Sequence, residues 1–246
     1  MMAETNFNKV SKTTCISKEK LMLFVYFVAA LSLLLLSVCI MTTGDSIESG
    51  QGFWDTKAIN YVYSIRDAYL SKFFIIITST GNPLTVAIIT VVISSILYLL
   101  KRRREAVFYI VNILGIWLLN ESIKAIVRRA RPSVVRLVHA SGYSFPSGHS
   151  MVFMTCSLIL IFFIVNFAKN KLFAYGSSIL VIIYGVMVGL SRIYLGVHYL
   201  SDVLAGWTFA AVWTLISVLI YTKISVKEEL QFSGDNINNN YMESER

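Results

Sequence analysis

The chain contains 246 residues, of which 56% are hydrophobic and only 15% are charged, and its formal net charge is +8. Soluble globular domains average about 45–50% apolar and about 25% charged residues. The shortage of charged residues therefore argues against a soluble enzyme, a disordered chain and a nucleic-acid-binding protein. With 13 glycines and three cysteines, the composition also excludes a collagen-like chain and a disulfide scaffold.

The apolar residues are gathered into long blocks. A helix that crosses a bilayer needs about 20 apolar residues, with a range of about 17–25. Six blocks in or near this range predict six transmembrane helices, at 21–43, 84–100, 107–123, 150–167, 172–190 and 203–221. We therefore expect an all-α, polytopic membrane protein with an N-terminal arm (1–20), a six-helix domain (21–222) and a tail (223–246). The Asn-rich tail with its four glutamates is predicted to be disordered.

The first block has an alternative interpretation as a cleaved signal peptide, because Lys18 and Lys20 precede it. Its apolar core is longer than the roughly 7–15 residues of a signal peptide. No clear small-residue cleavage site follows Cys39. A retained first span is therefore the favoured interpretation.

Two further segments depart from a simple row of spans. The apolar run at 73–78 is too short to cross a membrane and lies beside a Gly-Asn-Pro sequence at 81–83, so it is predicted to be interfacial or re-entrant. Polar residues in a membrane segment usually face the protein interior or a water-filled cavity. The block at 107–123 is expected to do so with Asn112, Asn120 and Glu121.

The cations outside the spans predict the orientation. Cytoplasmic loops of membrane proteins are enriched in Lys and Arg. Six spans place both chain ends and two loops on one face, which carries Lys9, Lys12, Lys18, Lys20, the 101–104 cluster, Lys169, Lys171, Lys223 and Lys227. We therefore expect a plasma-membrane protein with both termini in the cytoplasm. The outer segment at 44–83 has mixed charge and receives no assigned role.

One outer loop departs from the positive-inside rule. Between the third and fourth predicted spans it contains five cations, namely Lys124, Arg128, Arg129, Arg131 and Arg136. Either neighbouring loops set the topology and this loop tolerates the violation, or the cations bind an anion at the outer surface.

The first of three motifs near the outer ends of the spans is Lys124, six residues, then Arg131-Pro132. Seven positions are close to two helical turns, which predicts that Lys124 and Arg131 project from one face of a helix that continues out of the third span. Pro132 tends to end that helix at Arg131. On its own, the pattern also fits a juxtamembrane anchor.

The second motif is the sequence Ser-Phe-Pro-Ser-Gly-His-Ser at 144–150, directly before the fourth span. Proline and serine suit a helix start, where free N–H groups and the positive end of the helix dipole attract an anion. Gly148 would allow a ligand to approach the backbone. The alternative is an ordinary cap and turn with an incidental histidine.

The third motif is Ser191-Arg192, five residues, His198, three residues and Asp202. If His198 and Asp202 are helical, their i, i+4 spacing places them side by side. A carboxylate there can accept the proton of one imidazole nitrogen and leave the other nitrogen free to attack. The alternative is that Asp202 only caps the sixth helix and His198 lies on the surface.

Together, the motifs bring at least three cations, two histidines, a carboxylate, a hydroxyl and a helix N-terminus to one membrane surface. Phosphoryl transfer requires such groups: positive donors for the non-bridging oxygens, a nucleophile and a proton donor. Between Lys124 and Asp202, their order and spacing resemble the type 2 phosphatidic acid phosphatase (PAP2) superfamily of integral membrane lipid phosphatases, with no motif position substituted. The six-helix layout extends the resemblance over most of the chain.

The resemblance implies a role for each motif residue. His198 matches the histidine that attacks phosphorus and forms a phosphohistidine, and Asp202 matches the residue that orients it. His149 matches the histidine that protonates the leaving oxygen and then helps a water molecule to hydrolyse the intermediate. The implied phosphate-binding set is Lys124, Arg131, Ser147, the Gly148 amide and Arg192.

The remaining residues near the motifs receive weaker assignments. Ser191 is expected only to support the third motif. Arg128 and Arg129 lie outside the fixed pattern, and either favour a polyanionic head group or solvate the loop. His139 has no motif and is expected at the loop surface.

No cofactor is expected. The outer face offers no carboxylate cluster of the kind that Mg²⁺ prefers, and the resemblance implies metal-independent chemistry with cations neutralising the phosphate. No disulfide is expected either, since Cys39 and Cys156 lie in predicted spans and Cys15 in the cytoplasmic arm. The expected partners are the bilayer and a lipid phosphate, with no nucleic acid.

The resemblance leaves several substrates open. Bacterial members of this size act on undecaprenyl diphosphate, phosphatidylglycerophosphate or phosphatidic acid. An outward site favours undecaprenyl diphosphate, whose phosphate is exposed outside after glycan transfer. The spans exclude the family's soluble haloperoxidase branch, and a glucose-6-phosphatase-like role would usually come with more helices. The alternative of another class is a non-enzymatic lipid-binding or transport protein on the same scaffold, although no catalytic residue is lost here.

Overall fold

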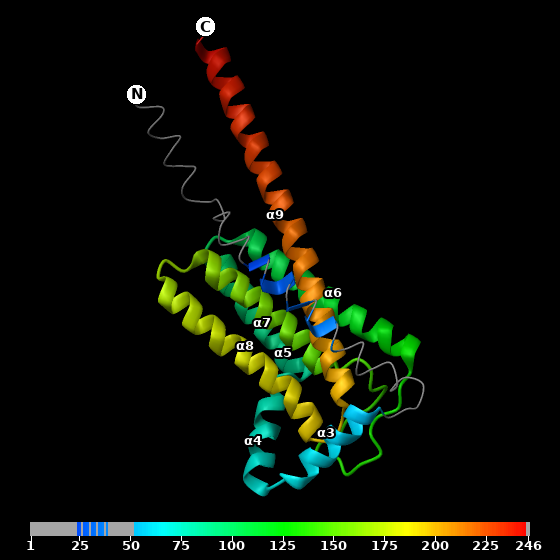
Figure 1. The fold of residues 1–246 in the computed structure, drawn as a ribbon. Helices are drawn as coiled ribbons and strands as arrows, with labels where there is room; N and C mark the ends of the chain where they lie inside the picture. Colours follow the sequence, from blue (N-terminus) through cyan, green and yellow to red (C-terminus); the bar gives the residue numbers. More distant parts are fainter. Residues whose placement is uncertain are drawn as a thin grey trace.

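The structure is a computed structural model that describes residues 52–244 and scattered positions between 24 and 38. Within this part of the chain the secondary structure is helical, without strands, as predicted for the fold class. The helices are α3 (Phe53–Ser64), α4 (Ala68–Ser79), α5 (Pro83–Leu99), α6 (Arg103–Val127), α7 (Gly148–Phe167), α8 (Lys171–Tyr194) and α9 (Leu200–Ser244) (Figure 1).

Four of these helices are long and apolar enough to cross a membrane: α6, α7, α8 and the Leu200–Ser225 part of α9. They contain the last four predicted spans. The pair α4 and α5, bent by 52°, is a fifth candidate, either as one broken span or as a re-entrant loop. The predicted first span at 21–43 falls largely outside the described residues, so four or five spans are seen.

Helix α7 forms the centre of the bundle, and it packs against α6, α8 and α9 (Figure 1). It is apolar on all sides, which is typical of a helix enclosed by others. Protein covers 72% of its apolar window but only 22% of that of α8. Large apolar side chains such as Leu172 and Leu180 are exposed on α8. The outer helices therefore present hydrocarbon outward, as lipid contact requires.

The segment before α5 bends sharply because its sequence interrupts the helix. Asp67 caps α4 by accepting hydrogen bonds from the backbone N–H groups of Tyr69 and Leu70. Pro83 occupies the first turn of α5, where its missing N–H costs nothing. The predicted interfacial or re-entrant run at 73–78 lies within α4 and forms no separate span.

One prediction about a helix end is wrong. Helix α6 ends at Val127, and Arg128 adopts a left-handed conformation with φ 51°, so Lys124 and Arg131 do not share a helix face. The chain then turns inward and buries Arg129. At the other end, α9 continues to Ser244 through the segment predicted to be disordered; residues 227–231 (Lys-Glu-Glu-Leu-Gln) have high helix propensity.

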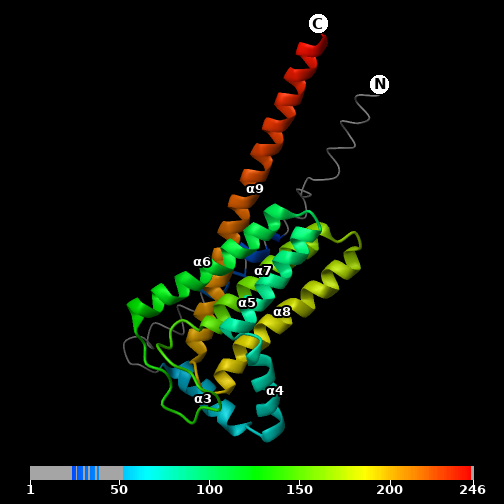
Figure 2. The ribbon, with the colours of Figure 1, turned by 180° about the vertical axis from the view of Figure 1, so that it is seen from behind.

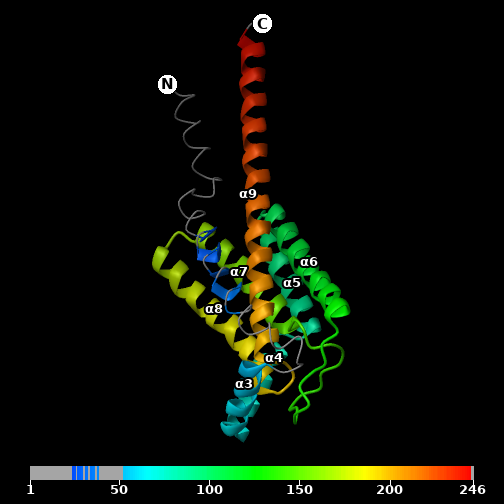
Figure 3. The ribbon, with the colours of Figure 1, turned by 45° about the vertical axis from the view of Figure 1, so that its right-hand side comes forward.

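The loop at 128–147, together with α3 and α4, lies at the end of the bundle opposite to the C-terminal part of α9 (Figures 1 and 2). Helix α9 projects well beyond the other helices on the far side (Figure 3). Backbone hydrogen bonds fix the loop, from Leu137 N to Leu195 O at 3.0 Å and from Ser147 N to Asp202 O at 3.1 Å. This end gathers the N-termini of α7 and α9 and the C-terminus of α8, where the three motifs lie.

Candidate active site

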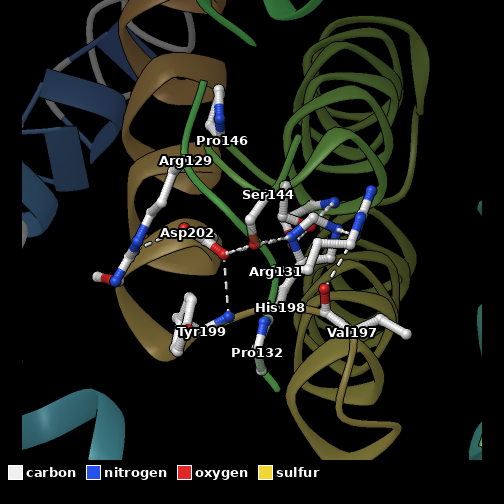
Figure 4. A network of polar contacts seen from close by, with 12 residues as sticks. Arg129, Arg131, Pro132, Ser144, Pro146, Val197, His198, Tyr199 and Asp202 are labelled. Carbon is white, nitrogen blue, oxygen red and sulfur yellow. Dashed lines mark hydrogen bonds and ion pairs between the residues drawn. The ribbon is translucent and has the colours of Figure 1, made fainter. Parts of the chain in front are cut away.

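His198 lies in the short turn between α8 and α9 and is 2% exposed. Its Nε2 is 3.0 Å from Nη1 of Arg131, and its Nδ1 is 3.4 Å from Oδ2 of Asp202 (Figure 4). A guanidinium can only donate, so Nε2 accepts and the imidazole proton lies on Nδ1. Burial lowers the pKa of His198 to about 4, although Asp202 acts in the opposite direction. The neutral ring therefore presents a lone pair at Nε2.

Asp202 lies in the first turn of α9 and is fully buried. Its Oδ2 accepts hydrogen bonds from the hydroxyl of Ser144 and, at 2.9 Å, from the backbone N–H of Tyr199 (Figure 4). Its Oδ1 accepts from Arg129 at 2.8 Å. Asp202 thus supports the helix start and also faces His198. The alternative of a surface histidine beside a purely capping aspartate is wrong.

Arg131 is held by the loop that surrounds it. Its guanidinium donates to the carbonyl oxygens of Gly142, Ser141 and Val197, at 3.0, 2.8 and 2.9 Å. Partial burial lowers its pKa, and the nearby Asp202 opposes that effect. Three carbonyl partners restrict the side chain to one orientation, so the fork that touches His198 is already positioned.

The start of α7 has the geometry that the second motif predicts. Ser147 is the N-cap, and its hydroxyl oxygen accepts from the N–H of Ser150 at 3.4 Å and from its hydroxyl at 2.9 Å. A Cβ on Gly148 would lie 3.0 Å from Oδ1 of Asn120 and 3.4 Å from Nζ of Lys124. The absence of a side chain thus brings the lysine against the helix N-terminus. Lys124 also pairs with Glu121 at 3.1 Å.

The break between α4 and α5 contacts the candidate site from another side. Oδ1 of Asn82 lies 3.1 Å from Nε2 of His149, and the hydroxyl of Thr78 accepts from Nη1 of Arg192 at 2.6 Å. A Cβ on Gly81 would lie only 2.7 Å from Cδ2 of His149. The bend therefore allows close packing on the histidine and supplies polar partners to two motif residues.

The structure thus brings the three motifs together. His149 lies close enough to Arg192, His198, Lys124 and Arg131 to interact with their charges. Sequence reasoning did not assign the partners Asp55, Thr78, Asn82, Asn120, Arg129 and Ser144. The local signals for them were the Gly-Asn-Pro break, the polar Asn120 within an apolar span, the cation Arg129 in the basic loop and the presence of Ser144 within the second motif.

The position of Arg129 corrects the interpretation of the loop at 128–147. It is buried, with 8% exposed, and binds Asp55 and Asp202 at 2.7 and 2.8 Å. It therefore neither solvates the loop nor faces a head group. Arg128 and His139 are exposed, as expected for residues outside the motifs.

Asn112 and Asn120 are buried within α6, as predicted for polar residues in a span, whereas Glu121 is exposed. Asn120 donates to the carbonyl oxygen of Pro146 at 3.4 Å and so touches the second motif. Among the described residues, no three His, Cys, Asp or Glu side chains are grouped in a way that could hold a metal ion.

The fold and the site together define a helical membrane protein in which histidine, arginine and aspartate side chains meet at one end of the bundle. Comparison with known proteins gives the family. The sequence pattern of the PAP2 superfamily matches residues 105–225. The chain is 32% identical over 148 residues to phosphatidylglycerophosphatase B of Bacillus subtilis, covering 58% of this chain and 71% of that protein.

Two further similarities extend over more of the chain. It is 25% identical over 212 residues to an undecaprenyl-diphosphatase of Sulfolobus acidocaldarius, covering 83% of this chain and 95% of that protein. The crystal structure of a transmembrane PAP2-type phosphatidylglycerolphosphate phosphatase from Bacillus subtilis superimposes with a TM-score of 0.68 at 26% identity, covering 81% and 96% of the two chains. The chain belongs to the PAP2 superfamily of membrane lipid phosphatases.

Proposed function

We propose that this protein hydrolyses a lipid-linked phosphate or diphosphate through a phosphohistidine at His198. The observation that carries the proposal is the arrangement of that ring, with Nε2 facing the Arg131 guanidinium and Nδ1 facing Asp202. A histidine in this tautomer has its lone pair where a phosphate bound to the arginine would lie. The family membership supports phosphatase chemistry.

In the first step, the Nε2 lone pair of His198 attacks phosphorus and the bond from phosphorus to the leaving oxygen breaks. His149 enters this step as the imidazolium, beside the bound phosphate dianion, and gives its Nδ1 proton to that oxygen. Asp202 stabilises the positive charge that develops on His198 by holding the Nδ1 proton. The products are the free lipid alcohol or lipid phosphate and phosphohistidine.

In the second step, a water molecule gives a proton to His149 and attacks phosphorus. The bond between Nε2 and phosphorus breaks, the lone pair returns to His198, and phosphate leaves. Both histidines then have their initial protonation states. Water must enter at the side from which the lipid has left.

The proposed phosphate-binding set is Lys124, Arg131, Ser147, the Gly148 amide and Arg192. The N-terminus of α7 adds free N–H groups and the positive end of its dipole. Such fixed donors stabilise the charge of a phosphoryl transition state. We assign charge neutralisation to these groups and propose that the reaction needs no metal ion. A chelator should therefore leave the rate unchanged.

We also propose that the site faces outward in a plasma membrane and that both termini are cytoplasmic. The α5–α6 and α7–α8 connections, with their cation clusters at 101–104 and 169–171, lie at the end opposite to the site (Figure 1). The positive-inside rule makes that end cytoplasmic. A cysteine introduced between residues 131 and 139 should react with an impermeant thiol reagent in intact cells; protection in intact cells and reaction only after lysis would reverse the orientation.

Undecaprenyl diphosphate is the first proposed substrate, with undecaprenyl phosphate and phosphate as products. An outward site would meet this carrier after its glycan has been transferred. The relative named undecaprenyl-diphosphatase aligns with most of this chain. Phosphatidylglycerophosphate and phosphatidic acid are the alternatives, and the relative named phosphatidylglycerophosphatase B supports the former.

The test is phosphate release by purified protein from each of the three lipids, with and without chelator. We expect the highest kcat/KM for undecaprenyl diphosphate and loss of release from every lipid in His198→Ala. A preference for another lipid would overturn only the substrate assignment. Release that does not depend on His198 would overturn the mechanism. Absence of release from all three lipids would favour a non-enzymatic lipid-binding or transport protein.

A further inference from the structure

A buried chain of charges lies behind the proposed nucleophile. Arg129 donates through Nη1 to Oδ1 of Asp202 at 2.8 Å and through Nη2 to Oδ2 of Asp55 at 2.7 Å. Both carboxylates are fully buried. Figure 4 shows the Arg129 guanidinium on the side of Asp202 away from His198. The arginine therefore joins the two carboxylates without contacting the side where substrate would bind.

Asp55 is fixed as firmly as Asp202. Its Oδ1 accepts from the backbone N–H of Ser201 at 2.9 Å, and its Oδ2 accepts from the Ser201 hydroxyl at 2.7 Å. That hydroxyl also accepts from Nη1 of Arg129 at 2.7 Å. The Tyr199 ring lies 4.1 Å from the guanidinium carbon. The network thus lies around the first turn of α9.

The contacts of Asp202 divide by oxygen atom. Its Oδ2 faces Ser144, Tyr199 and His198, whereas its Oδ1 faces Arg129. With Oδ1 held, the carboxylate cannot rotate its Oδ2 away from the imidazole. Arg129 also offsets the charge of Asp202, and Asp55 offsets the charge of Arg129. Two properties of Asp202, its orientation and its effective charge, thus depend on this network.

We propose that Arg129 and Asp55 are positioning residues that set the orientation and the charge of Asp202, and through it the basicity of His198. The proposal rests on the function proposed above. Asp55 comes from α3, outside the segment at 105–225 that matches the family pattern. The segment at 44–83, which received no role from the sequence, therefore supplies a residue that positions the proposed nucleophile.

The alternative is that the network only ties α3 to α9. Buried ion pairs are weak evidence of stabilisation, because desolvation offsets much of their attraction. A purely structural tie would change folding stability and leave the titration of His198 where it is. The titration is therefore the discriminating measurement.

Replacing Arg129 removes the cation that offsets Asp202. In Arg129→Gln the carboxylate should hold a proton on His198 more strongly, so the pKa of His198 should rise by about one unit or more. The other charged groups that act on His198 are Arg131 in the loop, Arg192 on α8 and His149 on α7. All three are unchanged in the variant, so the rise is attributable to Arg129.

The titration is measured on the full-length protein in detergent micelles by NMR of ¹⁵N-labelled histidine, with His198→Ala to assign the signal. This readout does not require activity, so it tests the network even if no lipid is hydrolysed. Arg129→Lys keeps the charge but loses the fork that spans both carboxylates, and should not show the rise. An unchanged pKa in Arg129→Gln would overturn the proposal.

Kinetics provide the second readout. Because Arg129 does not contact substrate, Arg129→Gln should lower kcat by about 10²-fold, the usual effect of a misplaced reacting group, and leave KM within about threefold. Arg128→Gln is the matched control, since Arg128 is the exposed neighbour whose Nε donates to the Ala125 carbonyl. An increase in KM with unchanged kcat would contradict a positioning role.

The double variant tests whether Asp55 acts through Arg129. Asp55→Asn should lower kcat by itself. Once Arg129 is glutamine, however, Asp55 is a buried carboxylate without its cation, and such a group is strongly destabilising. Asp55→Asn/Arg129→Gln should therefore be at least as active and as heat-stable as Arg129→Gln alone. If the loss of kcat in the double variant equals the product of the losses in the two single variants, the two residues act independently and the coupling is overturned.

Discussion

His198 and Arg131 are 67 positions apart in the chain, yet Nε2 of the histidine lies 3.0 Å from Nη1 of the arginine. This contact determines which ring nitrogen carries the lone pair, because the guanidinium can only donate. It also places a cation of the proposed phosphate-binding set beside the proposed nucleophile. The arginine comes from a loop and the histidine from a turn, so no local sequence pattern produces the contact.

On the acid side of the pH–rate profile, the rate of phosphohistidine formation should fall only at a pH well below the ordinary pKa of histidine. Burial lowers the pKa of His198 to about 4, so the nucleophile remains unprotonated as the pH falls from about 6.5. Single-turnover formation of phosphohistidine should therefore decline only near pH 4. The measurement is acid-labile ³²P incorporation against pH. A decline centred at about pH 6.5 that the substrate's own titration does not explain would contradict the lowered pKa of His198.

The same burial predicts how stability depends on pH. The folded state holds His198 neutral down to about pH 4, whereas the unfolded chain takes up the proton near pH 6.5. Between these values the unfolded state binds more protons, so the contribution of His198 makes the protein less stable as the pH falls. His198→Ala should show a smaller loss of heat stability between pH 6.5 and pH 5 than the parent.

His149 should matter more for a monoester than for a diphosphate. A phosphate leaving group is already a stable anion, whereas a lipid alkoxide needs a proton. His149→Ala should therefore lose less activity on undecaprenyl diphosphate than on phosphatidic acid. Proton transfer by a positioned side chain is worth about 10²–10⁴-fold, which sets the scale for the monoester. Equal losses on both substrates would remove the proton-donor assignment.

Asn82 should position His149. An amide oxygen can only accept, so Nε2 of His149 carries a proton, 3.1 Å from Oδ1 of Asn82, which leaves Nδ1 as the nitrogen that exchanges a proton with the leaving oxygen. Complete loss of a proton donor lowers the rate by about 10²–10⁴-fold. Asn82→Ala should lower kcat by less than this, with little change in KM. Asn82→Asp keeps the acceptor and should restore much of the rate.

The control for Asn82 is Ser79→Ala in the same bend. Ser79 is exposed, and its hydroxyl bonds to the carbonyl of Ile76 in its own helix. If Ser79→Ala and Asn82→Ala lower kcat equally, the effect belongs to the bend in general and not to the contact with His149.

Close packing of α8 on α9 depends on Gly189. A Cβ there would lie 2.5 Å from Cζ2 of the buried Trp207, so Gly189→Ala should cost about 1–3 kcal/mol as an overpacking substitution. Gly176→Ala on the same helix is the control, since its Cβ would meet nothing within 4 Å. Thermal unfolding in detergent should show a lower midpoint for Gly189→Ala only.

The sequence by itself determined the helical class and the motif residues that meet at one end. It also located four apolar helices, since the spans predicted at 107–123, 150–167, 172–190 and 203–221 lie within the helices at 103–127, 148–167, 171–194 and 200–225. Apolar blocks and i, i+4 spacings are local properties, and the bilayer requirement makes long apolar helices nearly unambiguous. The pairing of His198 with Asp202 follows from such a spacing.

Only the tertiary structure decided how the polar groups are paired. Helical spacing placed Lys124 and Arg131 on one face, but α6 ends at Val127, so the loop and not the helix presents Arg131. From the sequence, Arg129 is interpreted either as a head-group cation or as a solvated loop cation, and in the structure it is buried between Asp55 and Asp202. A buried ion pairs with whichever opposite charge the packing brings near it, and Asp55 is 74 positions away from Arg129 in the chain. Long-range packing, which no local pattern encodes, set these contacts.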